Sequence, residues 1–140
     1  MLISDQQYWV FDGESFFAPQ PLSSLGLPEY VDKLDDAFVW GKNGKTYFFY
    51  QNLYWRFNEA TKTMDSGYPQ DISRWNGVPR NIDAVLTSVF DGLTYFFKGE
   101  EFWTFDDYSL STAPDSPRKI NGFWTFTNLP ADRLTYVPIK

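Results

Sequence analysis

The 140-residue sequence contains no cysteine and no histidine. Without cysteine, the chain can form neither disulfides nor thiolate metal sites, and it has no cysteine nucleophile. Without histidine, it lacks the usual general base near neutral pH and the commonest zinc and haem ligand. These absences exclude a serine triad and a paired-histidine zinc protease site. We therefore predict no catalytic residues, no haem and no zinc in this chain.

Basic residues are also few. Lysine and arginine number 12 against 18 aspartates and glutamates, so the net charge of −6 has the wrong sign for a surface that neutralises nucleic-acid phosphates. No apolar run reaches the roughly 18 residues that a bilayer requires. Residues 1–20 lack the basic start and continuous apolar run of a signal peptide. We predict no nucleic-acid partner and no membrane span in this chain.

Aromatic residues, in contrast, make up 21% of the chain, and many of them recur in an internal repeat. Residues 34–75 align without a gap on residues 82–123, and an incomplete third copy opens the chain. The recurring segments are Thr46-Tyr47-Phe48-Phe49 with Thr94-Tyr95-Phe96-Phe97, Tyr54-Trp55-Arg56-Phe57 with Phe102-Trp103-Thr104-Phe105, and Tyr8-Trp9-Val10-Phe11 in the first copy. Because contacts between neighbouring units must repeat, we predict that the recurring aromatic residues form the core.

Each unit is predicted to contain short antiparallel strands. Asn43-Gly44 and Asp91-Gly92 are strong hairpin signals between aromatic and β-branched runs. The expected strands are residues 34–40, 46–50 and 53–58, then 82–89, 94–98 and 101–106, with an edge strand around Thr63-Met64. Period-2 alternation should place Trp55 and Phe57 on one face of their strand and Tyr54 and Arg56 on the other.

A short helix is expected over residues 69–75, with Pro69 near its start and Gly77 and Pro79 after its end. Repeats of roughly 40–50 residues with three or four strands are typical of propeller blades. The predicted fold is therefore a small all-β propeller with short helices between its blades.

At these residues the sequence resembles the hemopexin-like repeats in the carboxy-terminal domains of matrix metalloproteinases, especially the membrane-type members, and in hemopexin and vitronectin. The resemblance covers about residues 2–125. Besides the two aromatic strands, it rests on Leu34-Asp35-Asp36-Ala37, Ile82-Asp83-Ala84-Val85, Gly67-Tyr68-Pro69 with Ile72, and the Gly-apolar-Pro segments Gly26-Leu27-Pro28 and Gly77-Val78-Pro79.

The resemblance implies a four-bladed ring, of which this chain would supply two complete blades and part of a third. Residues 1–30 correspond to an incomplete blade, 31–79 and 80–127 to complete blades, and 128–140 to a tail that does not match the family ending. The incomplete blade lacks its first strand, which would leave a strand edge and apolar faces uncovered. Such edges and faces tend to contact another chain, so we expect self-association.

Asp35 and Asp83 occupy matching positions at the start of the expected inner strands, and two interpretations stay open. Aspartates commonly cap turns through local hydrogen bonds. The resemblance instead implies that these aspartates and nearby carbonyls face the propeller channel, where calcium binds oxygen ligands.

Four other residues, Trp40, Arg56, Arg74 and Trp75, differ in chemistry from their repeat counterparts Ser88, Thr104, Gly122 and Phe123. Tryptophan and arginine are favoured at binding hot spots, so we predict that these four contact a partner protein. The alternative is that the tryptophans serve packing alone.

The resemblance implies a non-catalytic protein-recognition module of an extracellular matrix metalloproteinase, which binds substrates or inhibitors or mediates dimerisation. Its partners would be extracellular matrix proteins, tissue inhibitors of metalloproteinases, or another copy of the chain. One alternative is a propeller of the seed-albumin type that binds a small ligand or a cation. The other is an enzyme using adjacent carboxylates, such as Glu100-Glu101 or Asp106-Asp107, although neighbours in sequence do not converge on one substrate.

Overall fold

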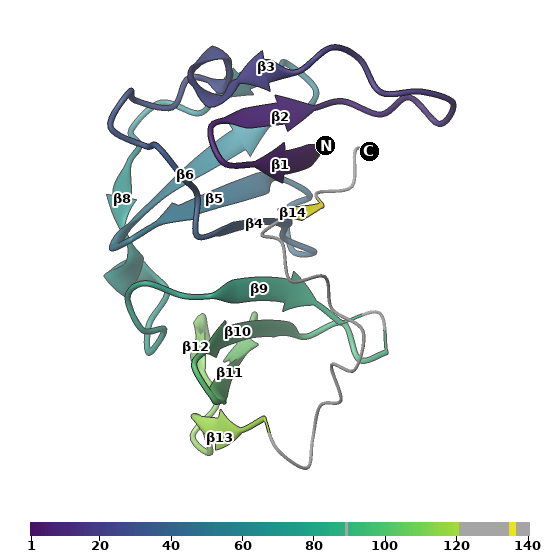
Figure 1. The fold of residues 1–140 in the computed structure, drawn as a ribbon. Helices are drawn as coiled ribbons and strands as arrows, with labels where there is room; N and C mark the ends of the chain where they lie inside the picture. Colours follow the sequence, from purple (N-terminus) through teal and green to yellow (C-terminus); the bar gives the residue numbers. More distant parts are fainter. Residues whose placement is uncertain (89, 121–134, 137–140) are drawn as a thin grey trace.

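The computed structural model describes residues 1–88, 90–120 and the backbone of 135–136. These residues form three antiparallel sheets, connected mainly by turns and short 3-10 segments (Figure 1). The expected all-β class is confirmed. Most of the predicted tail, residues 128–140, lies outside the described residues. No helix in the described part of the chain is long and apolar enough to cross a membrane.

The second and third sheets repeat one topology. In the second sheet, β4 (Asp36–Val39), β5 (Thr46–Tyr50), β6 (Leu53–Asn58) and β7 (Thr63–Met64) lie in chain order, and β8 (Gln70–Asp71) also pairs with β6. In the third, β9 (Ala84–Thr87), β10 (Thr94–Lys98), β11 (Glu101–Asp106) and β12 (Ser111–Thr112) follow the same order, and β13 (Arg118–Lys119) pairs with β11. The predicted bounds of the two middle strands of each sheet and of the Thr63–Met64 edge strand are confirmed, whereas both inner strands are shorter than predicted.

The first sheet contains an unexpected strand. β1 (Leu2–Ser4), β2 (Gln7–Trp9) and β3 (Gln20–Pro21) come from the start of the chain, and β14 (Thr135–Tyr136) pairs with β1 on its free edge. β14 therefore occupies the position that β4 and β9 occupy in the other two sheets (Figure 1). The prediction that β1 has no inner neighbour was wrong, because the end of the chain supplies one.

The helices expected between sheets are short 3-10 segments, η1 (Leu22–Leu25) and η2 (Ile72–Arg74). Asp71 caps η2, since its side chain accepts a hydrogen bond from the Ser73 N–H. Helix formation therefore begins later than predicted from Pro69. η1 buries Leu22 and Leu25, whereas η2 buries Ile72, and Trp75 follows directly after it.

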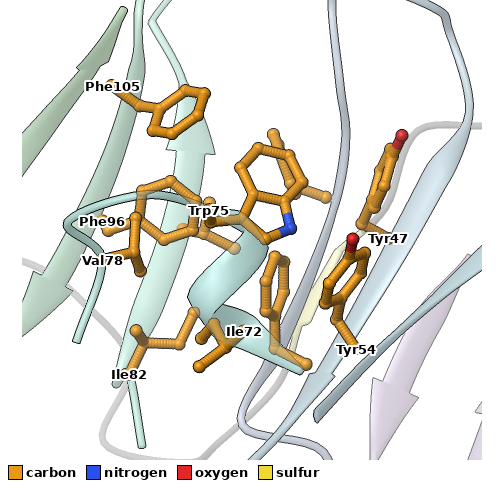
Figure 2. Packing of buried hydrophobic residues seen from close by; sticks show 11 residues of the cluster. Tyr47, Tyr54, Ile72, Trp75, Val78, Ile82, Phe96 and Phe105 are labelled. Carbon is orange, nitrogen blue, oxygen red and sulfur yellow. The ribbon is translucent and has the colours of Figure 1, made fainter. Parts of the chain in front are cut away.

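Two apolar clusters hold the three sheets together. The cluster between the first and second sheets contains Trp55 and Phe57, whereas Tyr54 belongs to the cluster between the second and third sheets (Figure 2). The predicted alternation along β6 is therefore confirmed. Trp103, the counterpart of Trp55, is only partly buried, so equivalent repeat positions are not equally covered.

Candidate functional site

The inner strands β14, β4 and β9 lie side by side where the three sheets approach one another (Figure 1). Asp36 links two of them, because its Oδ2 accepts a hydrogen bond from the Val85 N–H at 2.8 Å. The same carboxylate accepts from the N–H of Ala37 through Oδ1. Asp36 is not among the site residues predicted from the sequence, although its alignment with Ala84 marks it as a departure from the repeat.

Asp35 and Asp83 lie immediately before the inner strands and cap the hairpin turns beside them. The Gln51 N–H donates to Asp35 Oδ2 and the Gly99 N–H donates to Asp83 Oδ2, each at 2.7 Å. Each carboxylate thus caps a turn 16 positions away in the sequence, rather than through the local hydrogen bonds of the turn-capping interpretation. Oδ1 of each carboxylate lies outside this capping bond.

The electrostatic setting of Asp35 bears on the calcium interpretation. Burial raises the pKa of Asp35, and the negative charge of Asp83 raises it further, against the opposing hydrogen bond from Gln51. Calcium binds roughly six to eight oxygens, so two carboxylates would need carbonyls or water to complete a site. Within the described residues, no group of three or more acidic side chains gathers as a ready metal site.

Trp75 lies in the middle of the core rather than at the surface. Its side chain is 4% exposed and packs between the second and third sheets (Figure 2). Its ring centroid lies 4.9–6.0 Å from those of seven aromatic residues, Phe38, Trp40, Tyr47, Phe49, Tyr54, Phe96 and Phe105. This placement corrects its expected role from partner contact to core packing, because a buried indole is not accessible to a partner.

The indole nitrogen of Trp75 is an exception to the otherwise apolar packing. Nε1 is buried and has no hydrogen-bond partner among the described residues. The rings of Tyr47 and Tyr54 stand nearly perpendicular to the indole, at 88° and 78°. The unpaired indole N–H is therefore a cost to the folded state that the surrounding aromatic packing outweighs.

Trp40 is half-buried and connects two sheets. Its Nε1–H donates to Asp107 Oδ1 at 2.9 Å, and its ring packs against Trp75 with centroids 4.9 Å apart. The Lys42 ammonium lies 5.8 Å from the Trp40 ring centroid and donates to the Asp107 carbonyl. Trp40 therefore takes part in contact between sheets, and only its remaining exposed edge is available to a partner.

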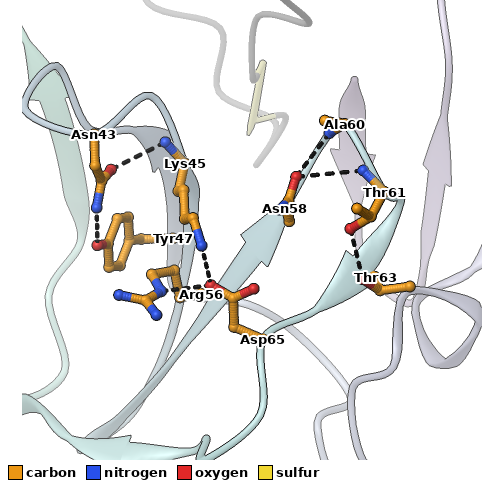
Figure 3. Close-up of polar contacts among 9 residues, drawn as sticks. All are labelled: Asn43, Lys45, Tyr47, Arg56, Asn58, Ala60, Thr61, Thr63 and Asp65. Carbon is orange, nitrogen blue, oxygen red and sulfur yellow. Dashed lines mark hydrogen bonds and ion pairs between the residues drawn. The ribbon is translucent and has the colours of Figure 1, made fainter.

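Arg56 belongs to a polar cluster on the second sheet, composed of Lys45, Arg56, Asp65 and Tyr68. Arg56 Nε and Lys45 Nζ both donate to Asp65 Oδ2, at 2.6 Å and 2.5 Å (Figure 3). The Arg56 guanidinium also lies 5.2 Å from the centroid of the Tyr68 ring. The hydrogen bond from Lys45, reinforced by Arg56, lowers the pKa of Asp65.

Of this cluster, only Arg56 is among the site residues predicted from the sequence. The repeat alignment held the signal, because Lys45, Asp65 and Tyr68 correspond to Leu93, Ala113 and Ser116. The polar cluster therefore departs from the repeat as a unit and is specific to the second sheet.

Arg74 ends η2 and is exposed. It has no hydrogen bond or ion pair among the described residues, so its guanidinium is available to a partner. Burial and the neighbouring Tyr68 raise the pKa of Tyr54 to about 12, and the positive charge of Arg74 moderates this rise. Arg74 and the polar cluster thus act on the same tyrosine.

The model of the Hemopexin family matches residues 34–80 and 82–128. The chain is 42% identical over 110 residues to "Matrix metalloproteinase-2" of Drosophila melanogaster, covering 77% of the chain and 14% of that protein. It is 43% identical over 89 residues to "Matrix metalloproteinase-25" of Homo sapiens, covering 63% of the chain and 16% of that protein. The chain thus spans a small part of these relatives.

Two solved plant structures share the fold. A hemopexin fold protein from cow pea, CP4, matches with a TM-score of 0.61 and 22% identity, covering 82% of this chain and 63% of that chain. A 2S albumin seed protein from Dolichos matches with a TM-score of 0.65 and 20% identity, covering 86% of this chain and 63% of that chain. At these identities the likeness concerns the fold alone.

Proposed function

The chain belongs to the hemopexin family, and from this membership we propose that it is a non-catalytic protein-recognition module of a matrix metalloproteinase-type extracellular protein. Its partners are extracellular matrix proteins or tissue inhibitors of metalloproteinases. The identity of 42% over most of the chain to a matrix metalloproteinase supports this class more strongly than the seed proteins do, at 20–22%.

The observation that carries the proposal is the polar cluster together with exposed Arg74. The polar cluster occurs in the second sheet alone among the described residues, and Arg56 and Arg74 are at least partly exposed, unlike Trp75, which also departs from the repeat but packs in the core. The ion pair with Asp65 fixes the Arg56 side chain over the Tyr68 ring. Because this side chain is already ordered in the free chain, binding a partner costs less side-chain conformational entropy. Arg74 adds an unpaired guanidinium of the kind enriched at hot spots.

Surface plasmon resonance tests this proposal with the immobilised chain and soluble gelatin, collagen or a tissue inhibitor. We expect at least one of these proteins to bind, and Arg74→Ala to weaken that binding roughly fivefold or more, the effect of losing about 1 kcal/mol or more. Lys33→Ala is the matched control, because Lys33 is also an exposed cation but lies outside the polar cluster. Equal effects of the two variants, or no binding to any of the proteins, would overturn the proposal.

The non-catalytic part of the proposal has its own test. The purified chain should release no fragments from gelatin or peptide substrates, because it has no histidine to bind zinc or act as a base. Peptide hydrolysis that co-purifies with the chain and disappears on chelation would contradict it.

A second candidate function is cation binding at Asp35 and Asp83, which the repulsion between these two carboxylates favours. A divalent cation or a polyamine such as spermine would relieve this repulsion and lower the raised pKa of Asp35. Calorimetry should then show binding of calcium or spermine that Asp35→Asn weakens. Unchanged binding in Asp35→Asn, or no heat with either ligand, would exclude this site.

A further inference from the structure

The first and second sheets treat one tyrosine position differently. Tyr54 in β6 pairs with Gln70. Tyr8 in β2 pairs with Gln20 in the same way, so it is the equivalent residue of the first sheet. The Tyr8 hydroxyl forms a hydrogen bond with Ser24 Oγ at 3.1 Å. The Tyr54 hydroxyl, in contrast, has no hydrogen-bond partner among the described residues.

An arginine replaces the serine that binds the equivalent tyrosine. Ser24 and Arg74 each lie four residues after the glutamine that pairs with the tyrosine of their sheet. The third sheet has neither group, since Phe102 pairs with Arg118 at the tyrosine position and Gly122 follows four residues later in the sequence. A tyrosine combined with an arginine at these two positions is therefore specific to the second sheet.

The Tyr54 hydroxyl is not required for packing. Phe102 fills the equivalent position of the third sheet and is 3% exposed, close to the 7% of Tyr54. Among the described residues, only Trp75 Nε1 and Thr94 Oγ1 are buried side-chain atoms without a partner, so the unpartnered Tyr54 hydroxyl reaches the surface. Burial raises the pKa of Tyr54 to about 12, so the hydroxyl stays protonated near neutral pH and offers its hydrogen to an acceptor.

Arg56 reaches the same region from the same strand. It lies two residues after Tyr54, on the same face of β6. The rings of Tyr47 and Tyr54 have centroids 6.1 Å apart, and their hydroxyls point the same way (Figure 2). Arg56 forms a hydrogen bond with the Tyr47 hydroxyl and donates through Nε to Asp65. A guanidinium has five N–H groups, so Arg56 keeps donors for a further acceptor.

This region has excess positive charge in an acidic chain. Lys45 and Arg56 share the single carboxylate of Asp65. Arg74 has no ion pair among the described residues. The positive charges of Arg74 and Arg56 also oppose the rise in the pKa of Tyr54, so both arginines act at its hydroxyl. Because the net charge of the chain is −6, its remaining surface repels a long polyanion, whereas one acidic side chain meets only these cations.

We propose that the Tyr54 hydroxyl and the guanidinium groups of Arg56 and Arg74 bind a carboxylate in an acidic segment of a partner protein. Hydrogen bonds from guanidinium groups to a carboxylate are of the strong, charge-assisted kind. The Tyr54 hydroxyl adds a donor that has no acceptor in the free chain. The proposal deepens the proposed recognition function and rests on it, since it names the chemical group of the partner that the second sheet binds.

A capped peptide with one central glutamate between glycines is the probe, and the same peptide with glutamine is its control. Titrated into the full chain, the glutamate peptide should saturably shift the guanidinium NMR signals of Arg56 and Arg74, and high salt should weaken its binding. Tyr54→Phe should weaken binding roughly fivefold or more, because it removes one donor. The same variant should keep or raise the urea midpoint, because the lost hydroxyl has no partner in the free chain.

Tyr8→Phe is the matched control, because it removes the equivalent hydroxyl from a sheet without the arginine, and it should not change peptide binding. Equal shifts with the two peptides, or equal peptide binding by the two tyrosine variants, would overturn the proposal. So would heparin binding that Tyr54→Phe abolishes if the glutamate peptide does not bind, since the occupant would then be a sulfated polysaccharide.

The fate of the proposed recognition function is read separately. Binding of a matrix protein or inhibitor that depends on Arg74 but not on the Tyr54 hydroxyl would overturn the carboxylate site and leave the proposed function standing. Peptide binding that depends on the Tyr54 hydroxyl, without binding of any of those proteins, would support the carboxylate site and contradict the proposed function.

Discussion

Replacing Trp75 with alanine removes the ring that joins the second and third sheets. Its neighbours come from both sides, including Phe49 in β5 and Phe96 in β10, with centroids 5.8 Å and 5.6 Å from the indole. These side chains are themselves fully buried, so they cannot collapse into the gap without moving their strands. We expect the cost to lie at the upper end of the usual range for large aromatic residues.

That range is about 3–5 kcal/mol, a large fraction of the 5–15 kcal/mol that typically stabilises a domain. The thermal midpoint should fall by roughly 10 °C or more. Trp75→Phe should cost less than Trp75→Ala, because phenylalanine keeps part of the packing and removes the buried, unpaired Nε1–H. Burying such a donor costs about 1–3 kcal/mol, so its removal offsets part of the lost contact.

Urea denaturation followed by circular dichroism measures both variants against the parent chain. Phe90→Ala provides the baseline for an exposed aromatic residue and should stay within about 0.5 kcal/mol of the parent. The reasoning would be refuted if Trp75→Ala unfolded at the parent's midpoint while losing a binding activity. That result would restore Trp75 as a surface contact.

Three further outcomes follow from the polar contacts and from β14. The hydrogen bond and ion pair with Lys45 lower the folded-state pKa of Asp65, so protonation of Asp65 as the pH falls below about 4 reduces the stability of the parent chain. Asp65→Asn should lack this part of the acid-induced loss of stability. Urea midpoints of both proteins at several pH values measure the difference. Asp36→Ala should cost about 1–3 kcal/mol in urea denaturation, because it leaves the buried Val85 N–H without its acceptor. Removal of residues 128–140 should speed amide hydrogen exchange in β1, and exchange at the parent's rate would contradict the pairing with β14.

The hairpins could be predicted from the sequence because their determinants are local. Asn43-Gly44 and Asp91-Gly92 fix the turns, and the aromatic runs on either side then pair in a register set by the turn. β14 could not be predicted in this way, because two residues carry little strand signal and their partner lies at the other end of the chain.

Departure from the repeat proved an ambiguous signal for the candidate site. It found Arg56 and Arg74, whose side chains are at least partly exposed. It also selected Trp75, which differs from its counterpart and yet packs in the core. A residue that differs from its counterpart in the alignment has a different environment in the two repeat units. Whether that residue is buried depends on which sheet packs opposite it, which the alignment does not contain. The same reason explains why Phe11 is exposed at a position where Phe57 is buried.

The pairing of β14 with β1 also has a consequence for the order in which the chain folds. The strand pairs of the second and third sheets join segments close in sequence. In the first sheet, by contrast, Leu2 pairs with Tyr136 across nearly the whole chain. Closing so long a loop has a large entropic cost, which is offset only when the intervening sheets are already compact. In the sequence β1 precedes the second and third sheets, and its inner neighbour β14 follows them. Of the three sheets, the one that begins earliest in this sequence is therefore the last to be completed.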